Sequence, residues 1–198
     1  PDTYLVNKPA TADEVVRKFL DNFLVKWNIA KRDVTQTTDQ TFIIPGYNNL
    51  SLSSGVKGLT VHQFVTLASI LEKETGRNIA GLGAEAKLAL QEERAIVAGI
   101  FYNRLIIGQG LESDATINYV SGKNDPSPLL TDTRIKSAYN TYINRGLPPG
   151  PISNPSLSSL QAVFAPTKTE YYYFLHKQPS GEVVYSKTFA EHVRNKNK

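Results

Sequence analysis

Two glutamates lie two positions apart near the end of a predicted helix, in the run Ala-Ser-Ile-Leu-Glu-Lys-Glu-Thr-Gly at residues 68–76. Cleaving a glycosidic bond requires a carboxyl group that stays protonated near neutral pH, and an apolar wall achieves this by penalising the charged form. A helix turns about 100° per residue, so Glu72 and Glu74 fall on opposite flanks of the apolar stripe. They therefore cannot act together on one cleft. Periodicity does not choose between them, and either could be an ordinary surface glutamate.

The sequence lacks the residues that other common kinds of catalysis would require. The sequence has no cysteine, which removes thiolate catalysis, disulfides and cysteine-ligated zinc. It also lacks a phosphate-binding glycine-rich loop and a strand-turn-helix serine elbow. His62, His176 and His192 are scattered and show no helical pair spacing for a metal. We expect no metal site and no cofactor.

The first half of the chain shows helical patterning. Residues 11–27 predict an amphipathic helix that begins with a capping box of Thr11 and Glu14. Its predicted apolar stripe consists of Val16, Phe19, Leu20, Phe23, Leu24 and Trp27. Residues 39–58 are rich in Gly, Asn and Ser and are interpreted as a loop with a short apolar run at 41–44.

The helix that carries both glutamates begins at Thr60 and is expected to run to about residue 75, with Gly76 as its stop. Residues 77–90 are rich in Gly and Ala, and their second half could itself be helical. A third helix is predicted from about residue 92 to 107, ended by Gly108.

The second half is polar and rich in turns between residues 110 and 155, and it includes the rigid run Gly-Leu-Pro-Pro-Gly-Pro at 146–151. A short helix is predicted for 157–164. The β-prone runs 171–175 and 183–185 flank a turn-forming cluster and predict a hairpin. The expected fold class is α+β, mostly helical, with a small antiparallel sheet near the C-terminus.

Composition sets broad limits. The 198 residues are 40% hydrophobic and 20% charged, as in a globular domain, and no apolar run approaches the roughly 18 residues of a membrane-spanning helix. No signal peptide is evident. The absence of Met indicates a fragment of a longer protein. The net charge of +4 is modest and partly sits in the C-terminal tail, so we expect no nucleic-acid partner.

Several blocks besides 68–76 follow one another in a recognisable order. They are Pro-Asp-Thr-Tyr at 1–4, Glu-Glu-Arg at 92–94, Ala-Gly-Ile-Phe-Tyr-Asn-Arg-Leu at 98–105, Leu-Glu-Ser-Asp-Ala-Thr at 111–116, Tyr-Asn-Thr-Tyr at 139–142, Gly-Leu-Pro-Pro-Gly-Pro-Ile at 146–152, Pro-Thr-Lys at 166–168, Tyr-Tyr-Tyr-Phe at 171–174 and Phe-Ala-Glu-His at 189–192. Together they resemble the YceG-like (MltG-type) endolytic murein lytic transglycosylases over nearly the whole chain.

The resemblance implies that residues 1–198 form one catalytic domain, with the family's membrane anchor and LysM-like module outside it. It implies that Glu74, the second Glu of the Glu-Lys-Glu-Thr run, is the catalytic acid and then base. The family's reaction cuts the bond between N-acetylmuramic acid and N-acetylglucosamine and leaves a 1,6-anhydromuramic end. That reaction uses no second carboxylate, metal or organic cofactor.

The implied partner is the glycan strand of peptidoglycan, whose stem-peptide carboxylates would suit a mildly basic groove. The parent protein is expected to be anchored in the inner membrane, with this domain on the periplasmic face. There it would work with peptidoglycan synthases and end nascent strands. The expected sugar contacts are Asp114, Thr116, Tyr139, Asn140 and Tyr142. For the tyrosines ordinary packing remains open, and for Asp114 a turn or cap.

Two departures from the family pattern stand out. Residues 77–90 look like an insertion at the rim of the cleft, and Ala115 replaces the usual Pro after the Asp. Two alternative functions also stay open. One is a hydrolytic muramidase that uses Glu74 with Asp114 as base or nucleophile, and the other is a non-catalytic peptidoglycan-binding module.

Overall fold

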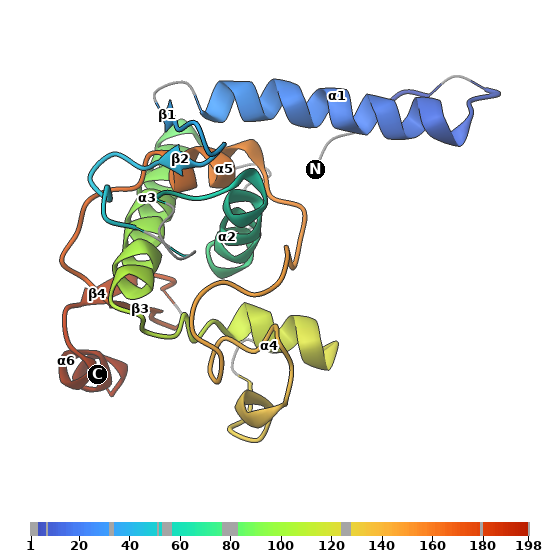
Figure 1. The fold of residues 1–198 in the computed structure, drawn as a ribbon. Helices are drawn as coiled ribbons and strands as arrows, with labels where there is room; N and C mark the ends of the chain where they lie inside the picture. The colour runs from blue at the N-terminus through green and yellow to red at the C-terminus, as the bar shows by residue number, and fades with distance from the viewer. Residues whose placement is uncertain are drawn as a thin grey trace.

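The computed structural model describes residues 4–6, 8–31, 34–50, 52, 57–76, 83–123, 128–178 and 180–197. Helices dominate this part of the chain, with two small antiparallel sheets, so the predicted fold class is confirmed (Figure 1). In chain order the elements are α1 (Ala12–Ala30), β1 (Thr35–Gln36), β2 (Phe42–Ile43), α2 (Val61–Glu74), α3 (Ala84–Ile106), α4 (Asp114–Ser121), the 3-10 helix η1 (Asp132–Arg134), α5 (Leu157–Phe164), β3 (Tyr173–His176), β4 (Val183–Ser186) and α6 (Phe189–Lys196).

Helix α1 begins as predicted, because Glu14 N donates to Thr11 Oγ1 at 3.2 Å and Thr11 N donates to Glu14 Oε2 at 2.8 Å. Its apolar stripe, however, is mostly not a core face. Phe19 and Leu20 are 47% and 56% exposed, and among the helix's residues only Trp27 is buried. Figure 1 shows the reason: α1 extends along one edge of the molecule, and only its C-terminal end reaches the body.

Four aromatic rings form the centre of the core where α1, β2, α2 and α5 meet. The ring centroid of Phe164 lies 4.2 Å from that of Phe64 and 4.8 Å from that of Trp27, and Phe42 packs edge-on against all three. Burying each such side chain contributes roughly 1.5–3 kcal/mol. This cluster fixes the N-terminal half of α2 against its neighbours.

The sequence predicted in part where helices α2 and α3 begin and end. Thr60 caps α2 as expected, since Gln63 N donates to Thr60 Oγ1 at 3.3 Å, and Gln63 completes a capping box that was not predicted. The separation of residues 84–90 from the third helix was wrong, because α3 runs unbroken from Ala84 to Ile106 with no Gly or Pro in its first fifteen residues. Gly108 ends it with a φ of +67°, as predicted.

The segment that resembles an insertion, 77–90, falls partly outside the described residues at 77–82. Its remaining part is the exposed first turns of α3. Leu88 is 61% exposed, whereas Leu90 is 6% exposed and belongs to the core. A deletion of this whole segment would therefore remove a buried side chain as well as surface.

Four elements were missed in regions read as loop or tail. Phe42 and Ile43 form a strand, since Phe42 is buried and pairs both with β1 and with Leu59. The polar stretch 110–155 contains α4 and η1, and the C-terminal tail forms α6 with a cap at Thr188. These helices are short, with few apolar residues, so periodicity gave no clear signal for them.

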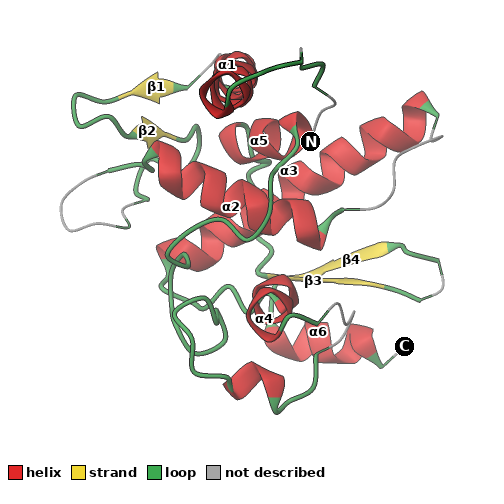
Figure 2. Ribbon diagram, turned by 90° about the vertical axis from the view of Figure 1, so that its right-hand side faces the viewer, coloured by secondary structure: helices red, strands yellow, loops and turns green. Residues whose placement is uncertain are grey.

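The predicted C-terminal hairpin is confirmed as β3 and β4, which pair antiparallel from Tyr173–Ser186 to His176–Val183. Figure 2 shows this hairpin between the end of α3 and the pair α4 and α6. In the described part of the chain, none of the helices combines the length and apolarity needed to cross a membrane.

Candidate active site

Glu74 is the last residue of α2, and the local sequence makes the chain leave the helix there. Thr75 ends the helix by donating from N and from Oγ1 to the Leu71 carbonyl, at 3.0 and 2.7 Å. At Gly76 a Cβ would lie 2.2 Å from the Glu72 carbonyl oxygen, so only glycine allows the chain to pass so close. The Glu74 side chain is thereby placed at an exit point rather than in mid-helix.

The Glu74 carboxylate faces the beginning of α4. Ser113 Oγ donates a short hydrogen bond to Glu74 Oε1, and the Ala115 N–H donates to the same oxygen at 3.4 Å. Ser113 is itself fixed, because its N–H donates to Thr141 Oγ1 at 3.0 Å. The predicted acid is therefore held by two groups whose positions depend on the segment 139–142.

The environment of Glu74 favours its neutral form. Burial raises the pKa of the Glu74 carboxyl above its ordinary value, and the nearby negative charge of Asp114 raises it further. The hydrogen bonds from Ser113 and Ala115 and the charge of His176 act in the opposite direction but do not cancel the shift. A carboxyl group with a raised pKa is suited to donate a proton near neutral pH.

Glu72 lies on the opposite flank of α2, as the helical spacing predicted. Its Oε2 accepts hydrogen bonds from Ser156 N at 3.0 Å and from the hydroxyls of Ser156 and Ser159, each at 2.6 Å. Burial alone would raise the pKa of Glu72, but these bonds and the charge of Arg94 outweigh burial and lower it. Glu72 is thus an ionised group that fixes the N-terminus of α5.

Arg104 on α3 is a buried cation of the site that sequence reasoning missed. Its Nε donates to the Tyr172 carbonyl at 2.6 Å and its guanidinium donates to the Leu111 carbonyl at 2.6 Å, which ties the hairpin to the segment leading into α4. Burial lowers its pKa, and the charges of Glu112, Tyr173 and Glu74 oppose that effect. The sequence did offer a signal, because Arg104 lies three positions after Phe101, on the apolar face of the predicted helix.

Of the five predicted sugar contacts, Asp114 and Tyr142 lie close enough to Glu74 to interact with its charge, and the five residues occupy two different settings. Tyr142 is 38% exposed, and its hydroxyl donates to Asp114 Oδ1 at 2.5 Å. Tyr139 is half-buried, with its ring centroid 5.0 Å from that of Tyr119. Thr116 and Asn140, in contrast, are fully buried.

The hydrogen bonds of the two buried residues account for their positions. Thr116 Oγ1 shares a 2.9 Å hydrogen bond with Thr141 Oγ1 and lies 2.7 Å from the Ser113 carbonyl. Asn140 Nδ2 donates to the Thr133 and Ile135 carbonyls at 3.0 and 2.8 Å. Both residues therefore shape the segments that face Glu74, and their polar atoms are directed at protein.

A family model described as the YceG-like family matches residues 1–198. The chain belongs to the YceG-like family. It is 41% identical over 140 residues to the endolytic murein transglycosylase of Bacillus subtilis, covering 71% of this chain and 35% of that protein. It is 38% identical over 144 residues to the endolytic murein transglycosylase of Streptococcus pneumoniae, covering 70% of this chain and 24% of that protein.

A crystal structure of a YceG-like protein from Listeria monocytogenes has the same fold. It superposes with a TM-score of 0.72 at 33% identity and covers all of this chain and 53% of the Listeria chain. The chain thus spans between a quarter and about half of the length of these relatives. Family membership and fold are established by these matches.

In the described part of this YceG-like chain, two cavities on the surface are lined by residues other than Glu74. One of about 340 Å³ lies beside α1 and includes Phe19, Phe23 and Asn154. The other, of about 300 Å³, is lined by Leu52, His62, Gln63 and residues 145–149. Four residues of the rigid run 146–151 line this second cavity, at the N-terminal end of α2.

Histidines contribute differently in the folded YceG-like domain. His176 Nε2 lies 2.8 Å from Glu93 Oε1, His62 lines the second cavity, and His192 stacks against Tyr173 with ring centroids 5.5 Å apart. Within the described ranges, no three His, Asp or Glu side chains gather in a group able to hold a metal ion.

Proposed function

We propose that this YceG-like domain cuts peptidoglycan glycan strands internally as a lytic transglycosylase, with Glu74 as general acid and then base. The observation that carries the proposal is the Glu74 carboxyl group, the one carboxyl group among the described residues whose pKa is raised, held against α4 by Ser113 and Ala115. The relatives that bear the name endolytic murein transglycosylase support the substrate and the reaction.

In the proposed reaction Glu74 donates its proton to the oxygen that links N-acetylmuramic acid to N-acetylglucosamine, and the bond from that oxygen to the muramic anomeric carbon breaks. The Glu74 carboxylate then takes the proton of the muramic 6-hydroxyl as its oxygen bonds to the same carbon. The proton balance at Glu74 is restored, and a 1,6-anhydro end forms. Because the nucleophile belongs to the same sugar, the reaction gains from proximity and needs no activated water and no cofactor.

Asp114, Tyr139 and Tyr142 are the proposed sugar contacts, since each keeps polar or aromatic surface accessible. Thr116 and Asn140 are proposed to act without touching the sugar, by fixing the backbone that carries Ser113 and Tyr142. Asn140 does this directly, because its Oδ1 accepts from the Tyr142 N–H at 2.9 Å.

A hydrolytic muramidase is the second candidate, and the position of Asp114 favours it. The Asp114 carboxylate neighbours Ser113, influences the pKa of Glu74 and accepts from Tyr142. A second carboxylate near the acid could activate a water molecule. A non-catalytic binding module is less well supported, because it would not need an acid whose burial costs free energy.

The products decide between these functions. Peptidoglycan digested by the full-length protein should yield muropeptides that end in 1,6-anhydromuramic acid, one water lighter than hydrolytic products, with a spread of strand lengths. Reducing muramic ends as the main product would favour the muramidase. Digestion products absent from both the domain and the full-length protein would favour the binding module.

The cellular setting of the domain is part of the same proposal. We propose that the full-length protein is anchored in the cell membrane with this domain on its extracytoplasmic face, and that it ends nascent strands beside peptidoglycan synthases. The family relationship supports this setting, since internal cutting at the membrane would fix strand length.

A further inference from the structure

The cavity of about 300 Å³ at the N-terminal end of α2 has the character of a binding site for an anion. Its charged side chain is Arg145, which is exposed, and His62 and Gln63 of α2 lie beside it. No acidic residue lines the cavity. Among the described residues, no carboxylate comes within ion-pair distance of Arg145, so none of these residues neutralises its charge.

Two backbone N–H groups at the start of α2 already donate hydrogen bonds within the helix cap. The N–H of Gln63 is already used by Thr60 Oγ1, and the N–H of Thr60 donates to Gln63 Oε1 at 2.9 Å. Of the side chains that line the cavity, Arg145 is the one that carries a permanent positive charge for an anion. The planar guanidinium of arginine matches a carboxylate with two parallel hydrogen bonds.

The cavity is connected to the Glu74 site by one short segment, residues 139–145. Thr141 and Tyr142 contact the residues around Glu74, and Arg145 follows three positions later. At 3.3–3.6 Å per residue, the Cα atoms of Tyr142 and Arg145 are at most about 11 Å apart. A ligand longer than one sugar could therefore touch both places.

Tyr139 and His62 lie between the cavity and the Glu74 site. They approach the same glycine, since an added Cβ on Gly150 would lie 3.2 Å from the Tyr139 hydroxyl and 3.6 Å from His62 Nε2. Along α2, twelve residues separate His62 from Glu74, which corresponds to about 18 Å of helix. The distance along α2 from the cavity to Glu74 therefore matches an oligosaccharide and exceeds a single sugar.

The cavity wall is held rigidly in place. Gly146 has a φ of +85°, a left-handed conformation that favours glycine, and Pro148 and Pro149 restrict the backbone that follows. Further along, Ile152 N donates to Ser69 Oγ and Ser153 Oγ donates to the Ser69 carbonyl, both at 2.9 Å. A wall fixed to α2 in this way does not have to be ordered when a ligand binds.

We infer that this cavity is an anionic subsite in which Arg145 binds the carboxylate of a stem peptide on a muramic acid one or more sugars away from the bond that is cut. The inference rests on the proposed function for the identity of the strand. It assigns to the domain a preference for strands that still carry peptides, exerted at a distance from Glu74.

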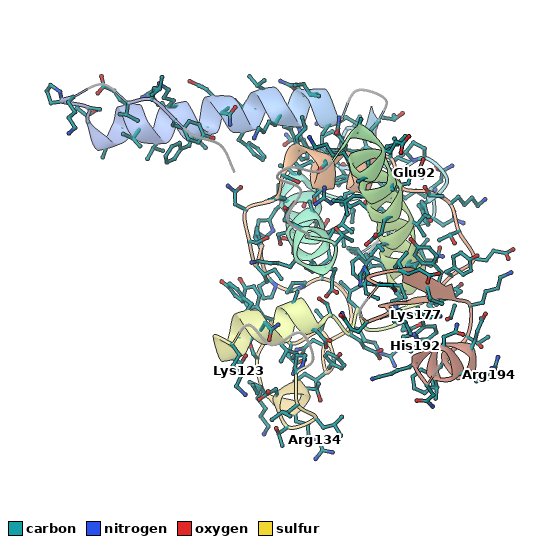
Figure 3. The ribbon with its side chains drawn as sticks, turned by 180° about the vertical axis from the view of Figure 1, so that it is seen from behind. Glu92, Lys123, Arg134, Lys177, His192 and Arg194 are labelled. Atoms are coloured by element: carbon teal, nitrogen blue, oxygen red, sulfur yellow. The ribbon has the colours of Figure 1, made fainter. Side chains whose placement is uncertain are left out.

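The test compares two substrates and two variants of the full-length protein. Arg145→Gln should raise KM about tenfold for peptide-bearing strands and leave kcat within about twofold. The same variant should be indistinguishable from wild type on strands stripped of peptides by an amidase, because the lactyl carboxylate that the amidase leaves on each muramic acid lies much closer to the sugar ring than the carboxylates of the stem peptide. Arg194→Gln on α6, labelled in Figure 3 and remote from α2, is the matched control and should change neither value.

A binding measurement separates this inference from the proposed function. In the Glu74→Gln background, peptide-bearing strands should bind about tenfold more weakly when Arg145→Gln is added. If wild type cuts neither substrate but this loss of affinity is seen, the proposed function fails and the subsite stands. If Arg145→Gln leaves affinity unchanged, or weakens both substrates equally, the subsite is overturned whatever the enzyme cuts.

Discussion

Glu72 and Glu74 occupy the same turn of α2 and have opposite chemical settings. Glu72 accepts three hydrogen bonds at the start of α5, beside Arg94, and its pKa is lowered. Glu74 lies at the start of α4, receives one strong and one long hydrogen bond, and its pKa is raised. The residue type is identical, so the difference arises from what packs against each flank of the helix.

This contrast shows how a short run of sequence can serve two purposes. Because a helix turns about 100° per residue, a spacing of two positions separates the side chains by about 200°. One flank supports the fold by holding an ionised carboxylate, and the other holds a carboxyl group that can carry a proton. Variants that exchange or remove these settings test the comparison directly.

The largest effect is expected from Glu74→Gln, which keeps the shape of the side chain and removes its proton. Strand cleavage should fall at least about 100-fold, the range typical of a lost general acid. The pKa of Glu74 is raised in the fold, so at any pH above its unfolded pKa near 4.5 the carboxyl group lowers the stability of the folded protein. The variant lacks this carboxyl group, so it should unfold at an equal or slightly higher temperature at pH 7. Digestion assays and thermal melts at pH 7 and pH 4 check this, and activity within a few fold of wild type would remove Glu74 from its role.

Glu72→Gln should have the reverse profile, with activity per folded molecule retained and stability reduced by about 1–2 kcal/mol, since charge-assisted hydrogen bonds are weakened. The pKa of Glu72 is lowered in the fold, so its contribution is complete above the unfolded value near 4.5 and is lost as pH falls through the folded value. Denaturant unfolding at pH 7 and pH 3.5 should show the difference from wild type shrinking in acid. A constant difference at both pH values would contradict the assignment.

Ser113→Ala tests the hydrogen bond that moderates Glu74. Removing that donor should raise the pKa of Glu74 further, because the bond stabilises the carboxylate. The alkaline limb of the pH–activity profile should therefore move to higher pH, with a fall of a few fold in the maximal rate. Ser121→Ala, at the other end of α4, is the control, and an unmoved limb in Ser113→Ala would show that the contact is unimportant in solution.

Tyr142→Phe should have the smallest effect. It removes the 2.5 Å hydrogen bond to Asp114 but leaves the ring as a surface for a sugar. We expect KM for strands to rise several fold and kcat to stay within about twofold. Tyr119→Phe, on the ring that packs against Tyr139, is the control. A 100-fold fall in kcat for Tyr142→Phe would instead place Tyr142 in the proton transfers.

Much of the fold followed from local sequence signals. The capping boxes at Thr11 and Thr60, the stop at Gly108 and the hairpin at β3 and β4 were all legible, because each depends on residues close together in the chain. The exposure of the α1 stripe was not legible. Amphipathic spacing says which face is apolar, and only the tertiary arrangement decides whether anything covers it.

The candidate site was predictable to a different degree at each residue. The position of Glu74 followed from the family resemblance, and helical spacing separated it correctly from Glu72. Arg104 and Ser113 were missed because their partners lie far away: Arg104 binds the Tyr172 carbonyl, and Ser113 binds Glu74 from 39 positions further along. The burial of Thr116 and Asn140 was likewise decided by packing between segments and not by any local pattern.

The attachment of the segment 146–159 to α2 at several heights has an evolutionary consequence. This segment contacts α2 at three successive positions, which are His62, Ser69 and Glu72. The spacing of the contacts along the segment therefore has to match the spacing of these residues along the helix. Inserting or deleting one residue in α2 would rotate everything beyond it by about 100° and shift it by about 1.5 Å. Lineages that carry this domain should therefore accumulate substitutions between these positions while the length of the helix stays constant.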